Sequence, residues 1–220
     1  MSERILLSIQ VGEPQSVPAI DGKPFRTSLF KTPVCEAIWL AAANLEGNRQ
    51  ADLRYHGGHD KAVCCFASEH YAALAEFVGA ELPHGAFGEN FTLRGMLEGE
   101  VCLGDRYRVG DAVVEVSQPR QPCSNLSRRW GKKTLPKTMV GHGFTGFYTR
   151  VIEEGMVQPG EPLLLLERPL EQWTIERLNR IMFVDKENLE ALGELVKLSQ
   201  LAVDWRKVFE ERLKAGTQSV

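Results

Sequence analysis

Cys123 is the residue of this sequence whose surroundings most favour chemistry. It lies in the segment SQPRQPCSNL, after an expected strand and before residues 124–130, which could begin a helix. Arg120 and a helix N-terminus would lower the pKa of its thiol, and a thiolate binds metals or attacks electrophiles. A buried, unreactive cysteine is the plain alternative. The other cysteines fit that alternative better, and they are Cys35, Cys64, Cys65 and Cys102.

Cys123 belongs to a stretch of the chain that contains no acidic residue. No Asp or Glu lies between Glu115 and Glu153, although the whole chain carries a net charge of -3. The basic residues of this stretch are Arg120, Arg128, Arg129, Lys132, Lys133, Lys137 and Arg150. Cations without carboxylate partners repel each other, and a bound phosphate relieves that repulsion. The stretch predicts an anion site, with a solvated basic surface or a nucleic-acid patch as alternatives.

A second candidate site is the glycine-containing segment 55–61, YHGGHDK. Gly57 and Gly58 would let backbone amides approach an anion, while His56 and Lys61 offer side-chain donors. A glycine turn between strands explains the same residues equally well. The spacing of histidines and cysteines fits no tetrahedral zinc site, so zinc is not expected.

The triplet Gly88-Glu89-Asn90 precedes an expected strand. Asn90 could donate its amide to a ligand and Glu89 could transfer protons, although turn chemistry explains the triplet as well. Residues 141–146 match GxGxxG, but the following FYTRVI is typical of a strand, so a nucleotide site is not expected.

The elements that must position these residues change in kind at Pro169, from strand-like segments before it to helical segments after it. Before it, short strand-like segments separated by turns predict a mainly β, mostly antiparallel barrel or sandwich. These segments are RILLSIQV, PFRTSLF, EAIWLAA, KAVCCFA, FGENFTL, RYRVG, AVVEVSQ, GFYTRVI and PLLLLER. One helix is expected over residues 69–78, capped by Ser68 and ended by Gly79.

Beyond Pro169, helical spacing of apolar residues predicts three helices. They are expected over residues 174–182, 186–198 and 203–214, with Asp185 and Asp204 at N-cap positions. Acidic and basic residues are nearly balanced in these three helices. The sequence leaves open whether they serve packing, dimerisation or docking of a partner.

Composition narrows the class of protein. With 43% hydrophobic residues, 220 residues can bury a substantial core. Five cysteines without CxxC spacing, and no secretory leader, favour a reducing cytoplasm. No apolar run is long enough to cross a bilayer, and the net charge of -3 gives no reason to expect nucleic-acid or membrane partners.

Four segments, taken in order, resemble the MOSC domain, a module related to the C-terminal part of molybdenum cofactor sulfurases. They are HGGHDKAV, AFGENFTL, LGDRYRVGDAVVEVSQPRQPC and GFYTRVIEEGMVQPGE. With its three-helix extension, the chain looks most like the bacterial YiiM subgroup. The resemblance implies a MOSC-type β-barrel in residues 1–168 and a small three-helix domain in residues 169–220.

The resemblance also implies a function. The motif cysteine of this family is proposed to ligate molybdenum, and some members reduce N-hydroxylated bases such as 6-hydroxylaminopurine to amines. By resemblance, Cys123 is the metal ligand and a catalytic residue, with His56, Lys61 and Glu89 as candidate proton donors. The residues expected to bind the molybdenum cofactor are Gly57, Gly58, Asp60, Asn90, Arg120, Arg128 and Arg129.

Partners follow from the same expectation. Neither a flavin motif nor an iron–sulfur motif is evident, so a separate reductase would supply electrons. Family habit makes a homodimer an expectation. The rival hypothesis is a carrier, in which Cys123 bears a persulfide or delivers the cofactor to another enzyme.

Overall fold

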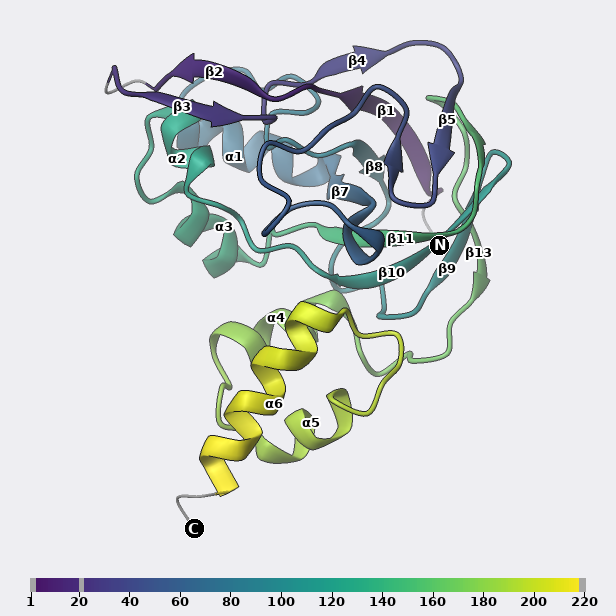
Figure 1. Ribbon diagram of the computed structural model, residues 1–220, viewed down its shortest axis with the longest axis vertical. Helices are drawn as coiled ribbons and strands as arrows, with labels where there is room; N and C mark the ends of the chain where they lie inside the picture. Colours follow the sequence, from purple (N-terminus) through teal and green to yellow (C-terminus); the bar gives the residue numbers. More distant parts are fainter. Residues whose placement is uncertain (1–2, 20–21, 218–220) are drawn as a thin grey trace.

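The computed structural model describes residues 3–19 and 22–217. The N-terminal three quarters of the chain form a strand-rich body. A group of helices formed by the C-terminal residues lies against one side of this body (Figure 1). Among the helices described, none has the length and apolar character needed to cross a membrane.

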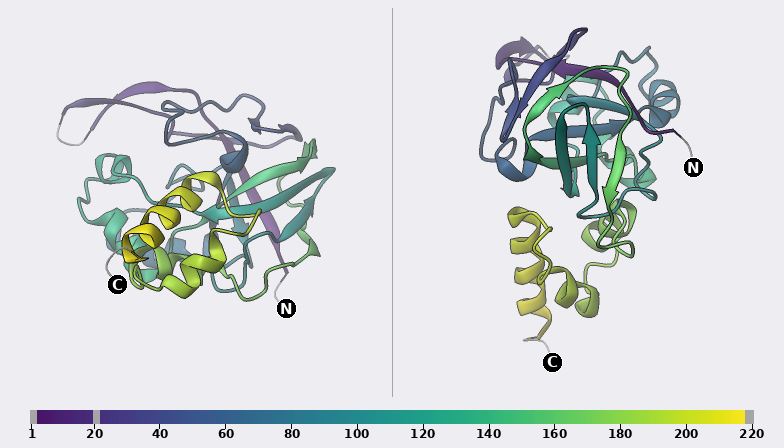
Figure 2. Two further views of the ribbon diagram at one scale, coloured as in Figure 1. Left: turned by 60° about the horizontal axis from the view of Figure 1, so that its bottom comes forward. Right: turned by 90° about the vertical axis from the view of Figure 1, so that its right-hand side faces the viewer.

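A curled eight-stranded sheet forms the body, in the order β13-β9-β10-β11-β7-β8-β1-β4. Its strands are β1 (Ile5–Val11), β4 (Thr32–Val34), β7 (Val63–Ala67), β8 (Phe91–Arg94), β9 (Arg106–Val109), β10 (Ala112–Pro119), β11 (Phe147–Glu153) and β13 (Leu164–Glu167). Neighbours are antiparallel except β7 and β8, which are parallel. Residues 160–163 bond back to the start of β1, with Leu6 N donating to Glu161 O at 2.9 Å. This contact closes the curl toward a barrel (Figure 2).

Two small sheets complete the strand-rich part. They comprise the hairpin β2 (Gln15–Pro18) and β3 (Pro24–Thr27), and the three-stranded sheet of β5 (Ile38–Ala41), β6 (Asn44–Leu45) and β12 (Gly155–Val157). Each of the nine strand-like segments of the sequence contains a strand, which confirms the mainly β prediction. β2, β4, β6 and β12 were not anticipated, because two to four residues are too few to show alternation.

The alternation of side chains along β7 and β11 gives the barrel two different faces. Cys65 and Phe147 belong to the barrel core. Cys64, one residue before Cys65, and Tyr148, one residue after Phe147, are directly opposite each other and point the other way. The outer face of these strands therefore presents a thiol and a phenol that other elements must cover.

Short helices pack against this part of the barrel. They are η1 (His59–Lys61), η2 (Ser68–His70), α1 (Tyr71–Val78), α2 (Asn125–Trp130) and α3 (Leu135–His142). The helix expected over residues 69–78 is confirmed, and Gly79 ends it with φ 77°. Ser68 is not its N-cap, because it opens the preceding 3-10 turn without a side-chain cap.

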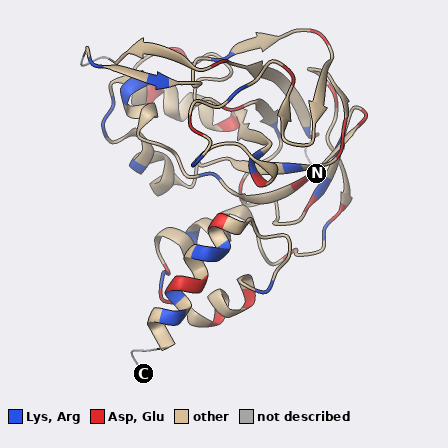
Figure 3. Cartoon of the chain, viewed as in Figure 1, with Lys and Arg blue, Asp and Glu red and all other residues tan. Residues whose placement is uncertain are grey.

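The C-terminal helices α4 (Ile175–Phe183), α5 (Leu189–Leu195) and α6 (Val203–Thr217) pack around their own core, which includes Leu178, Leu192 and Phe209. The predicted N-caps are wrong. Thr174 caps α4 and Asn188 caps α5. Asp185 instead accepts a hydrogen bond from Arg180, and Asp204 lies in the first turn of α6. Figure 3 shows both signs of charge along α6, so no basic face appears there.

A buried ionic network fixes the helical domain to the outer face of the barrel. Arg150 on β11 contacts Asp60 Oδ1 at 2.7 Å and Glu115 Oε1 at 2.9 Å, and it donates to Gln200 O at 3.0 Å. The other oxygen of Asp60 accepts from Val203 N at 3.0 Å, at the start of α6. The junction is thereby held by charge-assisted hydrogen bonds.

Candidate functional site

A cavity of about 670 Å³ lies where the outer face of the barrel meets the helical domain. Its walls come from residues 26–31 and 50–61, the strands β7, β10 and β11, the loop 120–125, and the helices α4 and α6. This volume is in the range of small-molecule and cofactor sites. The cavity is therefore the candidate functional site.

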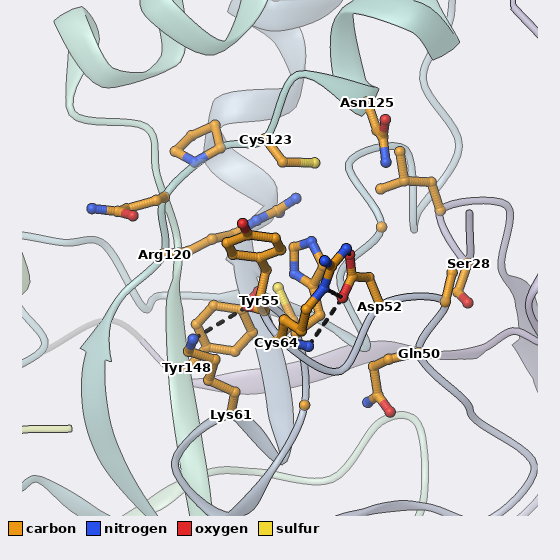
Figure 4. A pocket seen from close by; sticks show the side chains of 18 of the residues that line it. Ser28, Gln50, Asp52, Tyr55, Lys61, Cys64, Arg120, Cys123, Asn125 and Tyr148 are labelled. Atoms are coloured by element: carbon orange, nitrogen blue, oxygen red, sulfur yellow. Dashed lines mark hydrogen bonds and ion pairs between the residues drawn. The ribbon is translucent and has the colours of Figure 1, made fainter. Parts of the chain in front are cut away.

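Two cysteines face the cavity. Cys123 is half-buried on the loop after β10, and its sulfur points into the cavity (Figure 4), as the sequence predicted for a thiol at a barrel rim. Cys64 lines the cavity from β7, so its prediction as a mere packing residue is corrected. Burial and the nearby Glu89 raise the pKa of Cys64, although Arg120 acts in the opposite direction. Cys64 is therefore a protonated thiol at neutral pH. Cys35 is exposed, so the packing prediction is wrong there too.

Arg120 carries an unsatisfied hydrogen-bond donor at this cavity. Its side chain is 4% exposed, and its Nη2 donates to Phe87 O. Within the described residues, Nη1 has no partner, and neither do Ser28 Oγ and Gln118 Oε1, which line the same cavity. Buried polar groups are normally bonded, and these three groups are available to bond a polar ligand in the cavity.

The charges of the cavity wall are mainly positive. Arg54 pairs with Asp52 at 2.7 Å and Lys61 with Asp204 at 2.6 Å. The remaining cations are Arg26, Lys31 and Arg120, and no carboxylate of the described chain forms an ion pair with them. Arg120 is buried and Lys31 is half-buried, while Arg26 is exposed, and this excess of positive charge favours an anionic ligand.

The acid-free stretch supplies less of this charge than predicted. Of its seven basic residues, Arg120 alone lines the cavity. Arg129 donates from Nη1 to Leu29 O and to Gly85 O, and lies over the ring of Phe30 at 4.7 Å. Arg128 is exposed and lies over Phe25. These contacts anchor α2 against the N-terminal segment, which corrects the prediction that Arg128 and Arg129 bind the cofactor.

The segment 56–61 is only partly at the cavity. His56, Gly57 and Lys61 line it, whereas Gly58 and Asp60 do not. The carboxylate of Asp60 is engaged by Arg150 and by the start of α6, so its predicted cofactor role is corrected to a structural one. Gly57 has φ 83°, and a Cβ there would lie 2.9 Å from Gln50 Cδ.

His56 is uncharged at neutral pH. Burial lowers its pKa to about 4, and the positive charges of Arg120 and Lys61 act in the same direction. A protonated imidazole is therefore scarce at neutral pH, which argues against His56 as a proton donor.

This pKa makes the stability of the protein sensitive to acid. The unfolded chain binds a proton at His56 near pH 6.5 and the folded chain only near 4, so stability falls as the pH drops through that window. We expect the free energy of unfolding between pH 7 and pH 5 to fall by about 2 kcal/mol more in wild type than in His56→Gln. Urea unfolding of both proteins at the two pH values measures this. Equal losses would contradict a neutral buried His56.

Glu89 does not reach the cavity. Its side chain is fully buried and accepts hydrogen bonds from Tyr71 Oη, Gly85 N, Phe87 N and Thr92 Oγ1. The prediction that Glu89 transfers protons is therefore corrected, since all of its contacts are structural. Asn90 does line the cavity, but its amide is used by Cys64 N and Gln10 O.

The structure adds cavity residues that sequence reasoning missed. They are Lys31, Cys64 and Tyr148 from the barrel part, and Met182, Asp204, Trp205 and Val208 from the helical domain. Alternation along β7 and β11 was a usable signal for Cys64 and Tyr148, because their neighbours Cys65 and Phe147 face the core. The helical residues gave no such signal, since their apolar spacing is that of any packed helix.

Comparison with known proteins agrees with this architecture. The MOSC domain matches residues 52–164, and the YiiM-like, 3-alpha helix domain matches residues 173–216. The YflK protein of Bacillus subtilis (strain 168) is 43% identical over 207 residues, which cover 94% of this chain and 93% of that protein. A protein named Reductase from Gibberella moniliformis (strain M3125 / FGSC 7600) is 29% identical, covering 98% of this chain but 38% of that protein.

The crystal structure of YiiM from Geobacillus stearothermophilus shares the fold along nearly the whole chain. It superposes with a TM-score of 0.82 and 37% identity, covering 96% of this chain and 99% of that one. The family match spans most of the barrel, and the second match spans the three C-terminal helices. The chain therefore belongs to the MOSC domain family and carries the YiiM-like 3-alpha helix domain at its C-terminal side.

Proposed function

We propose that this protein is a molybdenum cofactor-dependent oxidoreductase that reduces N-hydroxylated compounds, such as 6-hydroxylaminopurine, to amines. The observation that carries the proposal is the cavity itself, which is lined both by the half-buried Cys123 and by Arg120, whose Nη1 has no hydrogen-bond partner among the described residues. A thiolate suits a metal, and a buried guanidinium with one unpartnered nitrogen suits an anionic group. The reductase relative and the MOSC family support the same class of chemistry.

The residues present fit this cofactor. Cys123 would provide the thiolate ligand to the metal. The phosphate would be held by Arg120, while the orphan Ser28 Oγ and Gln118 Oε1 would bond to polar atoms of the pterin. When bound, the cofactor supplies two-electron reduction of the N–O bond.

The protein around it positions the substrate and excludes water. Val208 of α6 gives the cavity a small apolar wall together with Trp205 and Met182, whose side chains lie almost wholly in the helical core. A planar heterocycle can pack on such a wall while its N-hydroxyl group faces the polar side. Electrons come from a separate reductase in this proposal.

A carrier that passes sulfur or cofactor to another enzyme is the alternative. A carrier thiol must reach its partner, but Cys123 faces a cavity between two domains rather than open solvent. The reductase is therefore favoured.

The test is a measurement of molybdenum and pterin per chain in protein purified from a host that makes the cofactor, together with reduction of 6-hydroxylaminopurine by an artificial electron donor. We expect stoichiometric cofactor and conversion of the hydroxylamine to the amine. A cyanolysable persulfide without metal would favour the carrier. Full cofactor loading with no reduction of any hydroxylamine would overturn the proposed reaction.

A further inference from the structure

The proposed reaction requires protons inside the cavity, and this inference rests on that proposed function. Reduction of R–NH–OH breaks the N–O bond and forms R–NH₂ and water, with two electrons from the reductase and two protons. The leaving oxygen departs readily only if it is protonated as the bond breaks. A residue of the cavity wall with an available proton is therefore needed.

The residues that the sequence singled out serve this role poorly. His56 is neutral at neutral pH, and Glu89 lies outside the cavity. Lys61 donates to Asp204 Oδ2 at 2.6 Å and to Tyr55 O at 3.2 Å, so its ammonium group is held at the junction with the helical domain.

Lys31 is placed differently. It lines the cavity from the segment between β3 and β4, and its Nζ donates to Asn48 Oδ1 at 2.5 Å. Asn48 is 4% exposed, and its own amide is fixed by Gly12 N and by Asn44 Oδ1. One hydrogen bond thus aims the ammonium group, and two N–H donors remain for a ligand.

We propose that the ammonium group of Lys31 donates the proton that the leaving oxygen of the N-hydroxylated substrate takes up. The neutral amino group of Lys31 then regains a proton from solvent. The second proton of the reaction, which goes to the nitrogen of the substrate, also comes from solvent. Lys31 is then a catalytic residue of the cavity alongside Cys123.

The charges around Lys31 suit an acid that works near neutral pH. Burial lowers its pKa to about 8. Glu89 before β8 acts against this lowering, whereas Arg120 after β10 acts with it, and Cys64 on β7 faces Lys31 as an uncharged thiol at neutral pH. His56 also faces this group of charges and is neutral. Proton transfer is most efficient when the pKa of the acid lies near the working pH.

A role in binding the anionic cofactor is the competing explanation for Lys31. The two roles separate in Lys31→Arg, because arginine keeps the positive charge but does not release its proton in proteins. Lys31→Met removes both charge and proton. Lys133→Met is the matched control, since Lys133 is an exposed lysine that does not line the cavity.

The experiment measures cofactor content and the pH dependence of kcat/KM for these proteins, and titrates the Lys31 side chain by ¹³Cε NMR in cofactor-free protein. We expect Lys31→Arg to keep its cofactor and lose about 100-fold or more in kcat/KM. The wild-type rate should fall as the pH rises past the pKa that NMR reports for Lys31, and this fall should vanish in Lys31→Arg. Methylammonium should partly restore the rate of Lys31→Ala.

Three results would overturn the role of Lys31. They are near wild-type kcat/KM with an unchanged alkaline fall in Lys31→Arg, loss of rate in proportion to loss of cofactor, and an NMR titration at the pKa of an ordinary exposed lysine. Each of these requires an active wild type. A wild type that reduces no hydroxylamine would instead overturn the proposed function itself, and the Lys31 role with it.

Discussion

Cys123→Ser is expected to lose its molybdenum and its hydroxylamine reductase activity while its free energy of unfolding stays close to that of wild type. A serine hydroxyl remains protonated at neutral pH and is a poor ligand for a soft metal site. The side chain of Cys123 is half-buried and faces the cavity, so the change leaves no unfilled space in a core. Metal analysis of the purified variant, with urea unfolding for stability, measures both quantities.

Cys64→Ser is the matched control, because Cys64 lines the same cavity but has a raised pKa. We expect this variant to keep its molybdenum, since burial raises the pKa of the Cys64 thiol and a protonated thiol is a poor metal ligand. Full metal content in Cys123→Ser, or metal lost from Cys64→Ser instead, would contradict the choice of Cys123 as the ligand.

Glu89→Gln is expected to destabilise the protein by about 3 kcal/mol, because a buried carboxylate that accepts several hydrogen bonds is replaced by a neutral amide. Oε1 of Glu89 accepts from Gly85 N at 2.9 Å, and Oε2 accepts from Phe87 N at 3.0 Å. An amide nitrogen in either place would face a backbone donor. For a chain of this size the thermal midpoint should fall by about 10 °C.

Thermal unfolding of cofactor-free Glu89→Gln measures this effect without any contribution from bound ligand. Glu76→Gln is the control, because Glu76 is exposed on α1 and the same change should cost little there. Wild-type stability combined with lost reductase activity in Glu89→Gln would restore Glu89 as a proton donor and contradict its structural role.

Much of the fold could be predicted because it depends on local patterns. Strand segments of four or more apolar-rich residues, the helix ended by Gly79, and three amphipathic helices after Pro169 all appear at about their expected places. The helix caps were less predictable, since Asp185 and Thr174 are equally good caps in isolation. Tertiary packing decides at which residue a helix begins, and that residue's neighbour becomes the cap. Thr174 caps α4 at the point where the chain pairs with Cys102 of the barrel part.

The candidate site shows the same division. Cys123, His56 and Lys61 were predicted as site residues from short motifs, and the structure brings all three to one cavity. Asp60 and Glu89 belong to those motifs too, but buried partners hold both of them away from the cavity. A motif reports which residues lie together in sequence, whereas hydrogen bonding to distant elements decides which of them stay free for a ligand.

The sequence by itself predicted the mainly β part and the three-helix extension from periodicity, and its ordered motifs carried the resemblance to the MOSC domain with Cys123 as the candidate ligand, because periodicity and motifs are local properties of the chain. Only the tertiary structure decided that Arg26 and Lys31, from the N-terminal part of the chain, join Arg120 of the acid-free stretch as the cavity cations that form no ion pair within the described chain. It also decided that α4 and α6 wall the cavity. These contacts join residues more than fifty positions apart, and their distances depend on how the barrel closes and where the helices dock.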